Sequence, residues 1–181
     1  RGLVGSEMCI RDRWIGTFRG LNKNNVHDYH QYFCTDDSLG LPDNQITHLL
    51  RDSKNRFWVG TVNGVCLYTD KDNFRIIPIE ADNKNVRQIL EDRNGRIFLN
   101  TGFQLYAYHP REEKITCVLP EISPGNAFYA QCHIAPDNNL WVMTSTGLRC
   151  YDPSTLQLKE SVALSGYPYY SYLHNLSLIH I

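Results

Sequence analysis

The chain has 181 residues, which is long enough for one domain with a sizeable core. Its 18 basic and 19 acidic side chains leave a formal net charge of −1, which argues against nucleic-acid binding and against contact with an anionic membrane. Charged residues make up 20% and hydrophobic residues 42% of the chain, so the composition excludes a disordered tail. The 15 Asn, 12 Gly and 11 Tyr beside only 7 Glu favour turns and strands over long helices.

The two ends differ in pattern from the interior. Residues 1–13 (RGLVGSEMCIRDR) and 176–181 (LSLIHI) resemble the conceptual translation of sequencing-adapter DNA, and we interpret them as non-native ends. The alternative is an ordinary terminal strand and tail. Residues 14–175 are then an internal fragment whose charge is −2, from 15 basic and 17 acidic residues.

An internal repeat organises the interior. Self-comparison aligns residues 46–79, 86–119 and 130–164, and a shorter copy covers residues 14–34. An aromatic side chain recurs at one position of each copy, with separations of 44, 40 and 43 residues: Trp14, Trp58, Phe98 and Trp141.

Each full copy divides into four short strands separated by polar turns. In the first full copy the predicted strands cover residues 46–51, 56–61, 65–69 and 74–79. A repeat of about 40–45 residues with four antiparallel strands is typical of a β-propeller blade, and no stretch suits the helices of a helical repeat. We therefore predict an all-β fold, an incomplete β-propeller with about three full blades plus partial blades. The four recurring aromatic residues are predicted to anchor adjacent blades to one another.

The first full copy resembles the two-component regulator propeller repeat. The matching elements are Gly40-Leu41-Pro42-Asp43-Asn44, then Asp52, then Trp58-Val59-Gly60-Thr61, then Gly64-Val65 and Tyr68. Trp14-Ile15-Gly16-Thr17 matches the same core. Phe98-Leu99-Asn100-Thr101 and Trp141-Val142-Met143-Thr144 depart from the repeat because they lack its glycine.

This resemblance implies a periplasmic sensing propeller of a membrane-anchored hybrid two-component histidine kinase of the Bacteroidetes type. Many such sensors respond to oligosaccharides, so the implied partners are an oligosaccharide and the remaining blades and domains of the parent sensor. The chain contains no kinase motif, and we predict no catalytic residue, no cofactor and no metal within it. The alternatives are a fragment of a propeller enzyme (a lyase or hydrolase) and a protein-interaction scaffold.

Ligand contacts are predicted on the loops between blades. In a propeller these loops share one face with those that join the second and third strands of each blade. The candidate loops are residues 33–45, 80–85, 120–129 and 165–170. Aromatic rings that cover the C–H face of a sugar, together with amides that bond its hydroxyls, give the candidate contacts Asn126, Phe128, Tyr129, Tyr167 and Tyr169. The alternative is that Phe128 and Tyr129 seal neighbouring blades together.

Several aspartates precede turns. Asp52 and Asp92 occupy the same repeat position, which indicates turn caps that bond backbone N–H groups and argues against a catalytic pair. Asp137 and Asp152 are interpreted in the same way.

The histidines and cysteines form no convincing metal or disulfide pattern. His27 and His30 have an H-x-x-H spacing without a third ligand, and His133 is expected in the core. Outside the suspect ends five cysteines occur without a C-x-x-C motif: Cys34, Cys66, Cys117, Cys132 and Cys150. The last four lie in predicted strands and are expected to be small core residues, with a cross-blade disulfide as the alternative.

Overall fold

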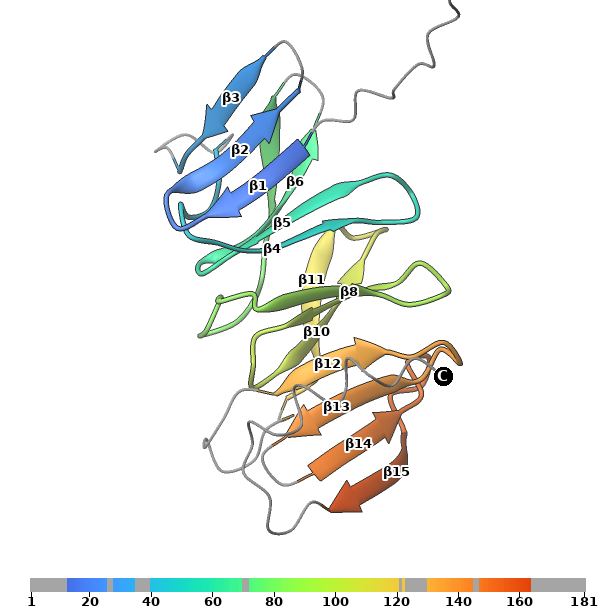
Figure 1. The fold of residues 1–181 in the computed structure, drawn as a ribbon. Helices are drawn as coiled ribbons and strands as arrows, with labels where there is room; N and C mark the ends of the chain where they lie inside the picture. The colour runs from blue at the N-terminus through green and yellow to red at the C-terminus, as the bar shows by residue number, and fades with distance from the viewer. Residues whose placement is uncertain are drawn as a thin grey trace, which may run out of the picture.

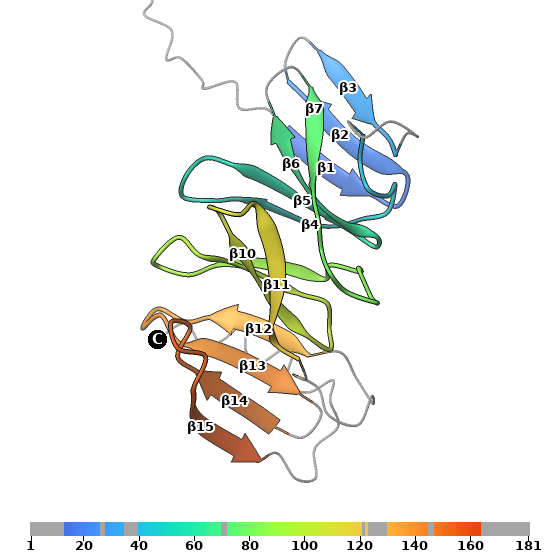
Figure 2. The same cartoon turned by 180° about the vertical axis from the view of Figure 1, so that it is seen from behind.

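The computed structural model describes residues 13–25, 28–34, 40–69, 72–120, 122, 130–144 and 147–163. These residues form 15 strands in four antiparallel sheets that follow one another along the chain. Figures 1 and 2 show the four sheets as layers of one continuous stack. Within the described residues, no helix has the length and apolar character needed to cross a membrane.

The first sheet has three described strands and the second has four. The first contains β1 (Arg13–Thr17), β2 (Gly20–Asn24) and β3 (Tyr29–Tyr32). The second contains β4 (Ile46–Arg51), β5 (Phe57–Thr61), β6 (Gly64–Thr69) and β7 (Asn73–Ile77). Because β1 carries the repeat's aromatic residue, β1–β3 correspond to β5–β7.

The third and fourth sheets repeat the four-stranded pattern. The third contains β8 (Gln88–Glu91), β9 (Ile97–Asn100), β10 (Leu105–His109) and β11 (Lys114–Leu119). The fourth contains β12 (Gln131–Ile134), β13 (Leu140–Thr144), β14 (Gly147–Tyr151) and β15 (Leu158–Ala163). In all three four-stranded sheets the spatial order of the strands is their chain order, which is the meander of a propeller blade.

A threonine closes the tight turn between the second and third strands of three blades. Its hydroxyl donates to the carbonyl of the glycine that opens the next strand: Thr17 to Gly20 (2.8 Å), Thr61 to Gly64 (2.9 Å) and Thr144 to Gly147 (3.0 Å). Gly20 and Gly64 have φ values of 117° and 133°, which residues with a Cβ atom rarely adopt. The sequence pattern Thr-x-x-Gly thus specifies this turn.

Three apolar clusters hold neighbouring sheets together, one at each junction. Trp58 is fully buried between the second and third sheets, where its ring meets the Tyr108 ring edge-on at a centroid distance of 4.9 Å. Phe98 is buried between the third and fourth sheets, and half-buried Trp14 packs between the first and second. Trp141 lies on the opposite face of β13 from buried Val142, outside all three clusters and half-buried.

The predicted fold class is confirmed, because three four-stranded blades and one three-stranded sheet make an incomplete all-β propeller. Predicted strand ends differ from those observed by one or two residues. The second strand of the first full copy starts at Phe57, since the backbone of Asp52 and Arg56 pairs to close the turn before it. The last strand ends at Ile77, because Pro78 lacks the N–H that would extend the pairing.

We expect Trp58→Ala to lower the free energy of unfolding of the full chain by about 3–5 kcal/mol, because the variant leaves a cavity between two sheets. Trp141→Ala is the matched control and is expected to cost less than half as much, because Trp141 already contacts solvent. Urea denaturation followed by circular dichroism measures both values. Equal losses in the two variants would contradict the assigned role of Trp58.

Candidate functional site

The stack of sheets has two faces of different chemistry. One, which we call the turn face, carries the turns between the first and second strands of each blade, residues 52–56, 92–96 and 135–139. The other, the connection face, carries residues 78–87 between the second and third sheets and the turns at residues 18–19 and 62–63. In Figure 1 the turns of the turn face project to the right, and the connections lie on the left.

Asp52 organises the first turn of the turn face. Its carboxylate accepts hydrogen bonds from the backbone N–H groups of Lys54 (3.0 Å) and Arg56 (2.8 Å). It also accepts one from Arg56 Nε (2.6 Å) and one from Trp58 Nε1 (2.9 Å). The Arg56 guanidinium lies over the rings of both Trp58 and Tyr108, at 5.2 and 5.3 Å from their centroids. The turn is thereby connected to the apolar junction between two sheets.

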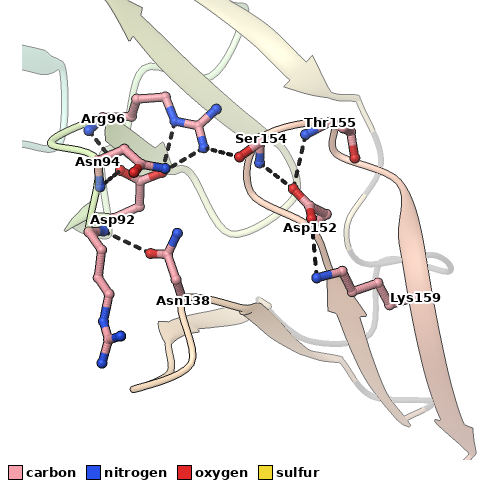
Figure 3. Close-up of polar contacts among 9 residues, drawn as sticks. Asp92, Asn94, Arg96, Asn138, Asp152, Ser154, Thr155 and Lys159 are labelled. Carbon is pink, nitrogen blue, oxygen red and sulfur yellow. Dashed lines mark hydrogen bonds and ion pairs between the residues drawn. The ribbon is translucent and has the colours of Figure 1, made fainter.

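Asp92 builds the equivalent turn with a different third partner (Figure 3). Its carboxylate accepts from the backbone N–H groups of Asn94 and Arg96, each at 2.9 Å. Phe98 has no ring N–H to replace that of Trp58, and the Arg96 guanidinium contacts Asp92 through both Nε (2.8 Å) and Nη2 (2.7 Å). Nη2 also donates to Ser154 Oγ of the fourth sheet at 2.9 Å, which ties two blades together.

Further hydrogen bonds join successive turns of the turn face. The backbone N–H of Ser53 donates to both carboxylate oxygens of Glu91, at 3.0 and 2.9 Å. The backbone N–H of Arg93 donates to Asn138 Oδ1 at 2.8 Å, as Figure 3 shows. The turns at residues 52–56 and 92–96 are thus each bonded to the next blade, so hydrogen bonds run along the turn face from the second sheet to the fourth.

Asp137 and Asp152 also bond backbone groups, but neither takes the place of Asp52. Asp137 accepts from the Asn139 N–H (3.0 Å), and Asp152 accepts from the Ser154 N–H (2.7 Å). Alignment on the aromatic anchors places Ala135 at the position of Asp52 in the fourth sheet. The backbone pairing between Ala135 and Asn139 still closes that turn, so its shape is retained without the buried carboxylate.

The electrostatics of Asp52 agree with a structural role. Burial alone would raise the pKa of its carboxyl group, but the hydrogen bonds from Trp58 and Arg56 and the charge of Arg56 outweigh burial and hold the pKa below its usual value. The side chains of Asp52 and Asp92 have no exposed surface. A carboxylate that is fully bonded and shielded in this way is unsuited to exchange protons with a substrate.

The structure places the histidines and cysteines as follows. His30 is exposed and its ring stacks on that of Tyr32 at 6.4 Å, whereas His27 lies outside the described residues. His133 is exposed, so its expected place in the core is wrong; it lies on the face of β12 opposite buried Cys132. Within the described ranges, no three His, Cys, Asp or Glu side chains gather as a metal site would require.

The five cysteines of the described chain are all free thiols. Cys66, Cys132 and Cys150 are buried in their strands, as expected of small core residues. The expectation is wrong for Cys117, which is exposed because β11 is the outermost strand of its sheet. Cys34 is exposed on the segment that follows β3.

All five predicted ligand contacts fall outside the described residues: Asn126, Phe128, Tyr129, Tyr167 and Tyr169. The described part of the connection face contains two other exposed aromatic residues. Phe18 occupies the turn between β1 and β2, and Phe33 directly follows β3. Phe33 lies in the predicted ligand-binding loop of residues 33–45. Phe18 lies outside all the predicted loops. Its place in a two-residue turn before a glycine, where small polar residues are usual, is the sequence signal that could have identified it.

We expect Asp52→Asn to lower the free energy of unfolding by about 2–4 kcal/mol at pH 7, because the amide nitrogen cannot accept the Arg56 and Trp58 bonds. Because the folded-state pKa of Asp52 is depressed, its contribution is present above the unfolded pKa of about 3.9 and is lost as the pH falls through the lower folded value. The difference between wild type and variant should therefore shrink below about pH 4. Urea titrations from pH 3 to 7 measure it.

The exposed Asp82 provides the control. We expect the free energy of unfolding of Asp82→Asn to stay within about 0.5 kcal/mol of the wild-type value at every pH. A constant gap between wild type and Asp52→Asn down to pH 3 would contradict the assigned ionic role of Asp52.

Comparison with protein families identifies one repeat. Residues 40–63 match the two component regulator propeller family, which confirms the predicted resemblance. The matched segment covers β4, β5 and the turn that Asp52 organises. No curated protein matches the chain.

Several solved propellers share the fold. The extracellular domain of a hybrid two-component system of Bacteroides thetaiotaomicron has a TM-score of 0.69 at 23% identity, over 87% of this chain and 21% of that one. A second such domain from the same organism has a TM-score of 0.65 at 24% identity, over 83% and 21%. Virginiamycin B lyase of Staphylococcus aureus has a TM-score of 0.65 at 16% identity, over 87% and 53%.

The chain therefore spans about one fifth of the length of the sensor domains that it resembles. Its similarity to the lyase shows that the same blade architecture serves an enzyme as well. The chain is an incomplete β-propeller that contains a two component regulator propeller repeat, and its fold matches part of the extracellular domains of hybrid two-component systems.

Proposed function

We propose that this chain is part of the ligand-sensing propeller of a two-component signal transduction sensor, and that the ligand is an oligosaccharide. The observation that carries the proposal is the regulator propeller repeat at residues 40–63, within a fold shared with two extracellular sensor domains. The propeller would lie on the extracytoplasmic side of a membrane-anchored protein. Histidine kinase activity would reside outside these residues.

The two faces of the stack suit different parts of this function. On the turn face, Asp52 and Asp92 bond arginines of their own blades, and Arg96 also bonds Ser154 of the next blade. The connection face presents exposed side chains with aromatic rings or amides, among them Phe18, Phe33 and Asn63. A sugar needs both kinds of group, because its C–H face is apolar and its hydroxyls bond amides.

Signalling would follow from the way in which neighbouring blades are joined. A ligand that contacts loops of two blades makes different contacts when the blades shift relative to one another. Its binding therefore stabilises one arrangement of the blades. The bonded turn face would transmit that shift as a movement of whole sheets rather than of single loops.

Enzymatic cleavage is the second candidate function, since virginiamycin B lyase shares the fold. The buried carboxylates of the described chain do not favour it, because Asp52 and Asp92 are committed to their turns. A protein-interaction scaffold is the third candidate and would bind a protein but no sugar.

The test is titration calorimetry of the full chain against maltohexaose, xylohexaose, arabinohexaose, trigalacturonate and heparan sulfate oligosaccharides. We expect one class to bind with a dissociation constant between about 1 µM and 1 mM, and to be recovered intact by chromatography after incubation. Cleavage of a bound sugar would favour the enzyme, and absence of binding to the whole panel would contradict oligosaccharide sensing.

A further inference from the structure

We propose that Phe18 and Phe33 together form a stacking site for a sugar ring on the connection face of the first sheet. This inference rests on the proposed function and gives it a location within the described chain. Phe18 is 79% exposed and Phe33 is 46% exposed. Neither ring belongs to the apolar cluster between the first and second sheets, so both present apolar surface to solvent.

Phe18 and Phe33 both lie next to Gly20 in the sheet, one before it in the turn and one on the neighbouring strand side. Phe18 and Arg19 form the two-residue turn that Gly20 closes, and Phe33 lies across the sheet from that turn. A Cβ at Gly20 would come within 3.0 Å of Phe33 Cδ1 and 3.2 Å of Cε1. The Phe33 ring therefore lies against the bare backbone at the end of the turn that carries Phe18.

Asn44 holds both segments in place. Its backbone carbonyl accepts from the Gly20 N–H at 2.7 Å, and its side-chain Oδ1 accepts from the Cys34 N–H, also at 2.7 Å. One residue thus fixes the position directly after the Phe18 turn and the position directly after Phe33. The backbone that carries the two phenylalanines is thereby preorganised, so a ligand does not pay the entropy of ordering these loops.

Comparison with the next blade shows that the fold does not require these rings. The register aligns Thr17–Gly20 with Thr61–Gly64, so Val62 stands at the position of Phe18. Tyr32 pairs with Leu21 as Ile77 pairs with Val65, so Pro78 stands at the position of Phe33. In the third sheet the same alignment gives Gly102 and Pro120. Blades of the same shape form without either ring.

The polar groups beside the rings complete the chemistry of a carbohydrate contact. Arg19 follows Phe18 in the turn and is exposed, and Asn44 is exposed beside Cys34. Guanidinium and amide donors bond ring hydroxyls while aromatic rings cover the C–H face. A sugar has both an apolar C–H face and a rim of hydroxyl groups, so it matches rings and donors placed side by side.

The test uses the same oligosaccharide panel with Phe18→Ala, Phe33→Ala and the double variant of the full chain. We expect each single variant to weaken binding of the sugar class that wild type binds by about tenfold, and the double variant to weaken it by about a hundredfold, which corresponds to about 1.4 kcal/mol per ring. Because both rings are exposed, the thermal midpoint of each variant should equal that of wild type within about 2 °C.

Tyr29→Ala is the matched control, because Tyr29 is 60% exposed in the same sheet. Its hydroxyl bonds Asn22, and the face on which it lies is opposite to that of Tyr32. We expect it to change sugar affinity less than twofold. Unchanged affinity in the Phe18 and Phe33 variants would overturn this site while the proposed function stands. If wild type binds no sugar in the panel, the proposed function fails and the site fails with it.

Discussion

A four-stranded sheet with apolar residues on both faces must bury both of them, and every other feature of this chain follows from that constraint. A single blade cannot bury both faces, because nothing packs against either side of an isolated sheet. The solution seen here is stacking, in which Trp58 of one blade meets Tyr108 of the next. The same junction recurs with Trp14 and Phe98, so the repeat of the sequence becomes a repeat of contacts between blades.

Polar contacts on the turn face reinforce the apolar contact between blades. Arg56 bonds the carboxylate of Asp52 and also lies over the Trp58 and Tyr108 rings, so one side chain joins the turn to the junction. Arg96 likewise joins its turn to the neighbouring blade, because it bonds both Asp92 and Ser154 (Figure 3). With one face bonded throughout, the opposite face is free to vary, and this is where Phe18 and Phe33 depart from the pattern of the other blades.

Repetition made the fold predictable, and departures from repetition limited the prediction of the site. The spacing of the aromatic anchors and the turns at Asp52 and Asp92 could be found by aligning the chain with itself. The bond from Ser53 to Glu91 could not, since it joins residues 38 positions apart whose pairing depends on how two blades are rotated. The exposure of Cys117 was missed for a related reason. The alternation of apolar and polar residues predicts on which face of a strand a residue lies. It does not predict whether that strand lies at the edge of its sheet.

The sequence by itself determined the class of fold, the number of strands in each blade and the residues that build the turns. These depend on local chemistry, such as the Thr-x-x-Gly turn and the aspartate before a polar turn, which acts over a few residues. Only the tertiary structure decided which side chains remain exposed once the blades stack. Phe18 and Trp58 are both large aromatic residues near a Gly, yet one is open to solvent and the other fully buried. Burial depends on the neighbouring blade, and that information lies about 40 residues away along the chain.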